Sequence, residues 1–157
     1  LHDALPISPL MPQVGDLVLK VRQPYASRLV AKVKTCEMRS RSVAKACRQV
    51  TPGTWVWFAS LQGALPGYDC CVVLGGARFV GEEGPLVPGS VHGEARWKEL
   101  EPQHTVEGSL KEFGVGMPKG YSSHVWAWQF ADAVALEPPA KMADTPYQMG
   151  FVKFAPR

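Results

Sequence analysis

The hydrophobic pattern near the start of the chain changes from a period of two to a helical spacing. Apolar residues alternate with polar ones through Leu17 and Leu19, which predicts a strand over 14–21. Pro24 then stands where a helix would begin, and apolar side chains recur at helical spacing as far as Val33. The pattern therefore predicts a strand, a turn and a helix in close succession.

A second strand is predicted directly after this helix. Polar side chains at Thr35, Glu37 and Arg39 alternate with the sulfur-bearing side chains of Cys36 and Met38. In a strand, this period of two places the polar three on one face of the sheet and the other two on the opposite face. We expect Cys36 and Met38 to face the core.

The rest of the chain is predicted to alternate short strands with turns. A short helix over 43–48 precedes the turn signal Pro52-Gly53, and another is expected over 106–113. Gly/Pro-rich 81–89 is interpreted as a loop between strands, and further strands are predicted over 54–60, 70–80, 91–98, 124–131 and 151–154. This pattern predicts an α+β fold, built on a small, mostly antiparallel β-barrel with two or three short helices.

Length and composition indicate one domain in a reducing compartment. A chain of 157 residues with 46% hydrophobic residues can bury one core, so we expect a single domain over 9–157. The leader 1–8 has no secretory pattern and holds the only isoleucine of the chain, so we expect it to be non-native. No apolar run approaches the roughly 18 residues of a membrane-spanning helix. Four cysteines without a C-x-x-C pair favour an intracellular protein, cytoplasmic or nuclear.

Positive charge is concentrated in one segment. Residues 20–48 carry nine basic residues and one acid, Glu37, whereas the rest of the chain has a net charge of −5. Such an asymmetry is typical of a protein that binds a polyanion. The alternatives are a solvated basic face without a partner and a protein-interaction scaffold.

Motifs for other chemistries are incomplete. His92-Gly93-Glu94 matches half of a zinc deaminase signature, but the P-C-x-x-C half is missing. The glycine-rich run 114–120 lacks the G-K-[ST] ending of a phosphate loop. His104 and His124 have no partner at metal-ligand spacing, and we interpret them as ordinary surface or capping residues. We expect no metal and no cofactor.

Three segments together carry a family resemblance. They read R-Q-P-Y-A at 22–26, K-T-C-E-M-R at 34–39 and G-T-W-V-W-F-A-S at 53–60. Their combination resembles the ASCH domain (activating signal cointegrator homology) of the PUA-like superfamily. The resemblance implies a PUA-like β-barrel with an RNA-binding cleft beside the first helix. The matching positions expected to line the cleft are Arg22, Gln23, Tyr25, Lys34, Thr35, Glu37, Arg39 and Ser60.

The favoured function is a binding module for RNA or other single-stranded nucleic acid, with DNA or a modified nucleoside as alternatives. Basic side chains would hold phosphates, while Tyr25, Tyr121 or Trp126 would stack on an unpaired base. Glu37 would accept a hydrogen bond from an exocyclic amine of the base. The alternative for Glu37 is an ion pair with Arg39 or Lys34. We expect the protein to be a monomer that acts without membrane contact.

The alternative function is an amidohydrolase for an acylated nucleoside such as N4-acetylcytidine. A small bacterial branch similar to the ASCH family uses a Lys and a Thr for that reaction, and Glu37 stands at the Thr position here. Lys34 would then act as base and Glu37 would activate water. The two can share a site only if Lys34 lies at the helix-to-strand junction, where burial and like charges should lower its pKa. Binding without catalysis is the favoured prediction.

In the resembling family, a glycine often ends the first helix. Lys32 occupies that position here, which leaves the end of the predicted helix open.

Overall fold

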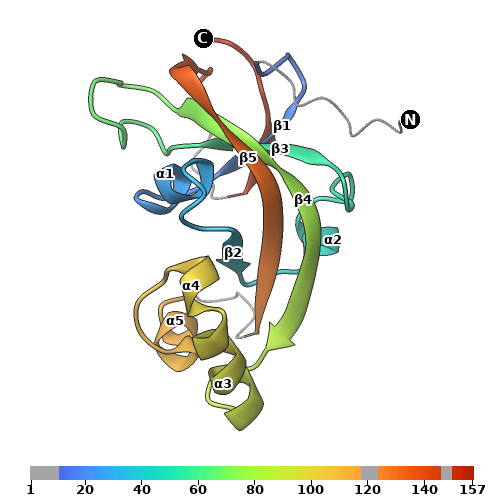
Figure 1. The fold of residues 1–157 in the computed structure, drawn as a ribbon. Helices are drawn as coiled ribbons and strands as arrows, with labels where there is room; N and C mark the ends of the chain where they lie inside the picture. The colour runs from blue at the N-terminus through green and yellow to red at the C-terminus, as the bar shows by residue number, and fades with distance from the viewer. Residues whose placement is uncertain (1–10, 118–123, 146–149) are drawn as a thin grey trace. The chain divides into compact units, whose positions relative to one another are not determined.

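The computed structural model of the chain describes residues 11–117, 124–145 and 150–157. Within them, the chain forms six strands and five helices (Figure 1). These elements group into two compact units, which comprise 1–30, 55–77 and 133–157 in the first and 31–54 and 78–132 in the second. Among the described residues, no helix is both long and apolar enough to cross a membrane.

The first unit is built around three neighbouring strands. It contains β1 (Leu17–Lys20), α1 (Tyr25–Val30), β3 (Trp55–Ala59), β6 (Phe151–Lys153) and parts of the two long strands β4 (Val72–Leu86) and β5 (Val125–Lys141). β1 pairs in parallel with β3, where Val18 lies opposite Trp57, and antiparallel with β6. Val18 and Trp57 are buried in the core of this unit.

The second unit combines β2 with four short helices. It contains β2 (Cys36–Arg39), α2 (Val43–Ala46), α3 (Val91–Glu99), α4 (Glu101–His104), α5 (Leu110–Val115) and the remaining parts of β4 and β5. Cys36 and Met38 are buried in its core together with Trp97, Leu100 and Leu110. The predicted inward orientation of Cys36 and Met38 is confirmed.

The strands form one mixed sheet with the hydrogen-bonded order β2-β5-β4-β3-β1-β6. The α+β class is confirmed, and the described residues hold five helices where two or three were expected. The expected barrel differs in one respect: the sheet is not closed, because the order ends at β2 and β6. Pairing of β1 with β3 is parallel, so the sheet is not uniformly antiparallel.

The prediction of a strand over 91–98 was wrong, because this segment is helix α3. The Ser90 side chain caps the helix by accepting a hydrogen bond from the Gly93 N–H at 3.0 Å. Trp97 and Leu100, three residues apart, are both buried, a spacing that suits a helix face. Val91 and Ala95 are four residues apart, a spacing that fits a strand and a helix equally well. The packing of Trp97 therefore distinguishes the helix from the strand.

The loop predicted over 81–89 was also wrong in its first part. β4 continues to Leu86, which is 2% exposed and packs in the core of the second unit. Gly84 lets the strand pass close to Trp126, since a Cβ there would lie 2.7 Å from the indole Cδ1. Gly84 therefore serves close packing within the strand and does not mark its end.

Lys32 adopts the left-handed conformation that glycine usually supplies after a helix. α1 ends at Val30, and Lys32 has φ 65°. We expect Lys32→Gly to raise the free energy of unfolding by about 0.5–1 kcal/mol, because a side chain in this conformation costs energy that glycine avoids. Chemical denaturation of both proteins measures the change. Lys45→Gly inside α2 is the control and should lower stability by about 1 kcal/mol.

Candidate functional site

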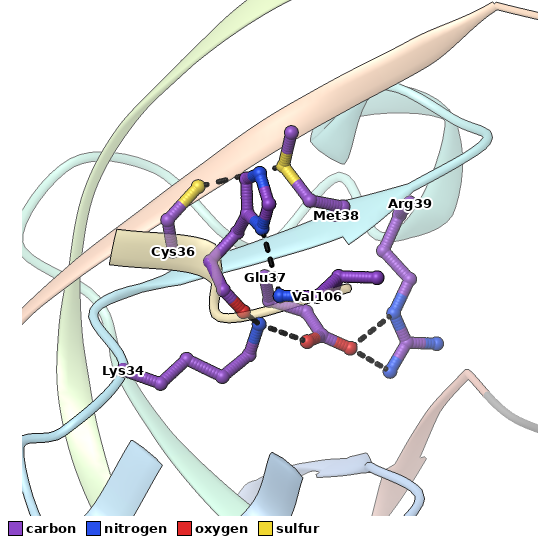
Figure 2. Close-up of polar contacts among 7 residues, drawn as sticks. Lys34, Cys36, Glu37, Met38, Arg39 and Val106 are labelled. Carbon is purple, nitrogen blue, oxygen red and sulfur yellow. Dashed lines mark hydrogen bonds and ion pairs between the residues drawn. The ribbon is translucent and has the colours of Figure 1, made fainter. Parts of the chain in front are cut away.

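Lys34 lies in the short connection before β2 and is completely buried. Its side chain has 0% relative exposure. The Nζ atom donates a hydrogen bond to the His104 carbonyl oxygen at 2.5 Å and lies 3.4 Å from Glu37 Oε1 (Figure 2). Because β2 begins at Cys36, Lys34 lies before the strand, and its side chain does not have to follow the alternation of faces in β2. The condition for Lys34 and Glu37 to meet, a position of Lys34 before the strand, is therefore fulfilled.

Glu37 lies between two cations. Its Oε1 faces Lys34, and its Oε2 accepts from both Nε and Nη2 of Arg39, at 2.9 and 2.8 Å. The Glu37 side chain is 10% exposed and that of Arg39 is 14% exposed. The structure thus places Glu37 in an ion pair with Lys34 and with Arg39, which were the two partners considered for it.

Arg39 is held on the sheet by an aromatic side chain as well. Its guanidinium carbon lies 5.7 Å from the centre of the Trp128 ring, and the Trp128 Nε1–H donates to the Arg41 carbonyl at 3.0 Å. In the antiparallel pairing of β2 with β5, Glu37 lies opposite Trp128 and Arg39 opposite Trp126. Directly opposed residues project to the same face. One face of this sheet edge therefore carries two charged and two aromatic side chains.

Burial lowers the pKa of the Lys34 ammonium. Loss of hydration is the largest cause, the Glu37 carboxylate opposes it by raising the pKa, and Arg39 lowers it further. The direction agrees with the prediction made from burial and like charge. A lysine with a lowered pKa begins to lose its proton at a lower pH than an exposed lysine does.

His104 supports the cluster from α4. It is fully buried, so its interpretation as a surface residue was wrong. Its Nδ1 accepts from the Val106 N–H at 2.9 Å, which leaves the ring proton on Nε2, 3.0 Å from the Trp97 carbonyl. Burial lowers its pKa, the Trp97 carbonyl raises it and Lys34 lowers it. The neutral ring is thus fixed, and its backbone carbonyl is presented to Lys34.

The opposite face of β2 is inert. The Cys36 thiol lies 3.6 Å from the Met38 sulfur, and burial raises the pKa of Cys36 to about 12. A thiol with so high a pKa is a poor nucleophile at neutral pH. The charged side chains of this strand therefore lie on the face of Glu37 and Arg39.

Two other expected site residues of the second unit, Thr35 and Trp126, lie close to this cluster along the sequence or sheet. Thr35 is exposed, and its N–H donates to the Gln103 carbonyl at 3.0 Å. Trp126 is half-buried and lies opposite Arg39. Tyr121 lies outside the described residues. The structure thus brings Lys34, Glu37 and Arg39 into direct contact and leaves the role of Thr35 and Trp126 as a prediction.

The expected site residues of the first unit occur in a separate set of contacts. Gln23 binds Ser27 twice, through Nε2 to the hydroxyl at 2.7 Å and through Oε1 to the Ser27 N–H at 3.0 Å. Tyr25 lies under the Arg28 guanidinium at 5.4 Å, and Arg22 is exposed. Ser60 is fully buried, and its hydroxyl accepts from the Val72 N–H at 3.3 Å.

Sequence reasoning missed the contributions of His104 and Trp128 to the cluster. Trp128 was interpreted only as a core residue, and it is indeed 2% exposed. The β2–β5 register places Trp128 opposite Glu37. The alternation of the two strands could suggest this register once they are known to pair, but the sequence does not show that they pair. His104 is 70 positions from Lys34, and no local pattern marks it as a partner.

Comparison with known proteins identifies the fold. No family model and no curated protein matches the chain. Crystal structures of an ASCH protein from Zymomonas mobilis and of one of its mutants have TM-scores of 0.58 and 0.59, at 12% and 14% sequence identity. The alignments cover 90% and 92% of this chain and 88% and 92% of those chains. The chain therefore shares the fold of these ASCH proteins.

Proposed function

We propose that this protein binds single-stranded nucleic acid, with RNA as the preferred ligand, through the face that carries Arg39 and Trp126. The observation that supports this most directly is the fixed guanidinium of Arg39 opposite the half-buried indole of Trp126. A guanidinium donates well-oriented hydrogen bonds to phosphate, and an indole offers a surface on which an unpaired base can stack. A single nucleotide, with a phosphate next to a base, is the smallest ligand that uses both the guanidinium and the indole.

The surrounding charge favours the same kind of ligand. Residues 31–54 of the second unit carry six basic residues and one acid, Glu37. Arg41, Lys45 and Arg48 are exposed in the segment that follows β2. Exposed basic side chains release counterions when they meet phosphates, which strengthens binding without selecting a sequence.

The expected affinity depends steeply on salt. For single-stranded nucleic acid, the slope of log K against log salt should decrease in magnitude by about 0.7 for each phosphate contact that is removed. Fluorescence anisotropy with a mixed-sequence RNA oligonucleotide, measured over a range of salt concentrations, gives this slope. A flat dependence would contradict the proposal.

We expect Arg39→Ala to weaken RNA binding about tenfold, since a charge-assisted contact is lost. Arg22→Ala tests the expected contribution of the first unit in the same assay. Arg78→Ala and Lys153→Ala lie outside the basic segment 20–48 and serve as controls. Equal losses in all four variants would show that the binding face has been assigned to the wrong residues.

The second candidate function is hydrolysis of an acylated nucleoside. It is favoured by one observation, the lowered pKa of a lysine whose Nζ lies 3.4 Å from a carboxylate. The full burial of Lys34 argues against it, because a substrate could not reach Nζ in this arrangement. We expect no deacylation of N4-acetylcytidine by the purified protein. Turnover that is lost in Glu37→Gln while RNA affinity survives would favour the hydrolase.

A further inference from the structure

We propose that Lys34 is a positioning residue, a buried counter-cation that neutralises Glu37 so that Arg39 keeps its positive charge for an anionic ligand group. The effect on affinity rests on the proposed function, whereas the coupling between the three side chains does not. The ligand group addressed by Arg39 in this arrangement is a phosphate.

The exposure of the three side chains separates their roles. Relative side-chain exposure is 0% for Lys34, 10% for Glu37 and 14% for Arg39. A ligand that approaches from solvent can touch the exposed part of Arg39 but has no exposed surface of Lys34 to touch. Lys34 therefore contributes through its charge and not through contact.

The charges of the cluster explain why a second cation is needed. Glu37 and Arg39 alone form a neutral pair, in which the carboxylate cancels much of the attraction between Arg39 and a phosphate. Lys34 at 3.4 Å from the other carboxylate oxygen gives the cluster a net charge of +1. Because Lys34 itself is buried, the surplus charge is presented at the Arg39 end.

The geometry also fixes the direction of Arg39. Its Nε and Nη2 both donate to one oxygen, Oε2 of Glu37, so one edge of the guanidinium is held on the carboxylate. The Trp128 ring supports the guanidinium at 5.7 Å, and the Trp128 indole is tied to the Arg41 carbonyl. A guanidinium held in this way loses less rotational freedom when it binds a ligand.

Lys34 is itself held in place from the other side. The His104 carbonyl accepts from Lys34 Nζ, and the His104 ring is fixed between the Val106 N–H and the Trp97 carbonyl. His104 also packs on the Trp97 ring, with 4.1 Å between the ring centres. The ammonium therefore stays beside Glu37 and is not available to swing toward a ligand.

The test removes the two inner charges one at a time and then together. Lys34→Met makes the Glu37–Arg39 pair neutral and should weaken binding of a mixed-sequence single-stranded RNA oligonucleotide about tenfold. The double variant Lys34→Met/Glu37→Gln restores the unbalanced charge of Arg39, and its affinity should return to within about twofold of the unmodified protein. Lys153→Met removes an exposed lysine outside the basic segment 20–48 by the same substitution and is the matched control.

Recovery of affinity in the double variant is the result that a purely structural role of Lys34, or a direct contact of Lys34 with RNA, cannot produce. If Lys34 touched the RNA, the double variant would bind as weakly as Lys34→Met, and the proposal would be overturned. In an Arg39→Ala background, Lys34→Met should have no further effect, since Arg39 is the group through which it acts. Circular dichroism establishes that each variant is folded, and Lys34→Gln, which keeps a donor for the His104 carbonyl, replaces Lys34→Met if that variant is not.

A ligand-free measurement separates this inference from the proposed function. The NMR resonance of the Arg39 Nε–H should shift in Lys34→Met and stay unchanged in Lys153→Met. If the unmodified protein does not bind RNA but this shift occurs, the proposed function fails and the coupling stands. If RNA binds but neither the shift nor the rescue is seen, the role assigned to Lys34 is wrong.

Discussion

Glu37→Ala is expected to lower the free energy of unfolding by about 3–5 kcal/mol, because it removes the carboxylate that pairs with both Lys34 and Arg39 in a buried group of charges. Lys34 would remain fully buried beside Arg39 without the carboxylate that lies 3.4 Å from its ammonium. The His104 carbonyl, which also accepts a hydrogen bond from Lys34, carries no net charge. Urea denaturation of both proteins at about pH 7 measures the difference.

The pH dependence of this loss identifies its origin. Burial already lowers the pKa of Lys34, and removal of Glu37 takes away the largest influence that raises it. A lysine whose pKa is lower in the folded protein than in the unfolded chain binds fewer protons when folded, so stability rises with pH up to the unfolded pKa. The deficit of Glu37→Ala should therefore be smaller at about pH 10 than at about pH 7.

Glu99→Ala is the matched control for this prediction. The Glu99 side chain is 66% exposed and lies 3.8 Å from Arg96. Loss of such an exposed pair should change the free energy of unfolding by less than about 1 kcal/mol. A similar loss in both variants would mean that burial of the charges near Glu37 has no special cost.

Acidification should destabilise the protein through His104. The folded protein holds this ring neutral, because Nδ1 accepts from the Val106 N–H and Nε2 lies 3.0 Å from the Trp97 carbonyl. Burial lowers its pKa, with Lys34 acting in the same direction and Glu101 opposing it. At acidic pH the unfolded chain therefore binds a proton at this histidine that the folded protein does not bind. Stability is lost as pH falls below the unfolded pKa of about 6.5.

The expected loss in the free energy of unfolding follows from the difference between the folded and unfolded pKa values of His104. Each pH unit between the unfolded and folded pKa values costs up to about 1.4 kcal/mol, so the step from pH 7 to pH 5 should cost up to about 2 kcal/mol. Urea denaturation at both pH values measures it, and His104→Gln should remove this part of the dependence. His92 is exposed, so His92→Gln should leave the dependence unchanged. Identical pH profiles for His104→Gln and the unmodified protein would contradict the assignment.

Sequence alone determined the face of β2 that carries the charged side chains. Strict alternation from Cys36 to Arg39 separates buried sulfur-bearing side chains from Glu37 and Arg39, and a strand has only two faces. The same alternation required Lys34 to precede the strand if it was to meet Glu37. Both features are local, and the structure agrees with both.

The helix over 91–99 shows where a local pattern stops being sufficient. Its apolar residues suit a strand and a helix alike, and the segment follows a stretch rich in glycine and proline. Burial of Trp97 with Leu100, together with the Ser90 cap, selects the helix. Short segments of this kind take the structure that their packing partners favour.

The sequence determined that a basic segment contains one acid and that this acid is flanked by Lys34 and Arg39. Only the tertiary structure decided which of these cations is buried and which is partly exposed. His104 reaches Lys34 across 70 positions of the chain, and Trp128 reaches Arg39 through strand pairing. Contacts between residues so far apart depend on how the whole core packs, and a periodicity read over a few residues carries no information about them.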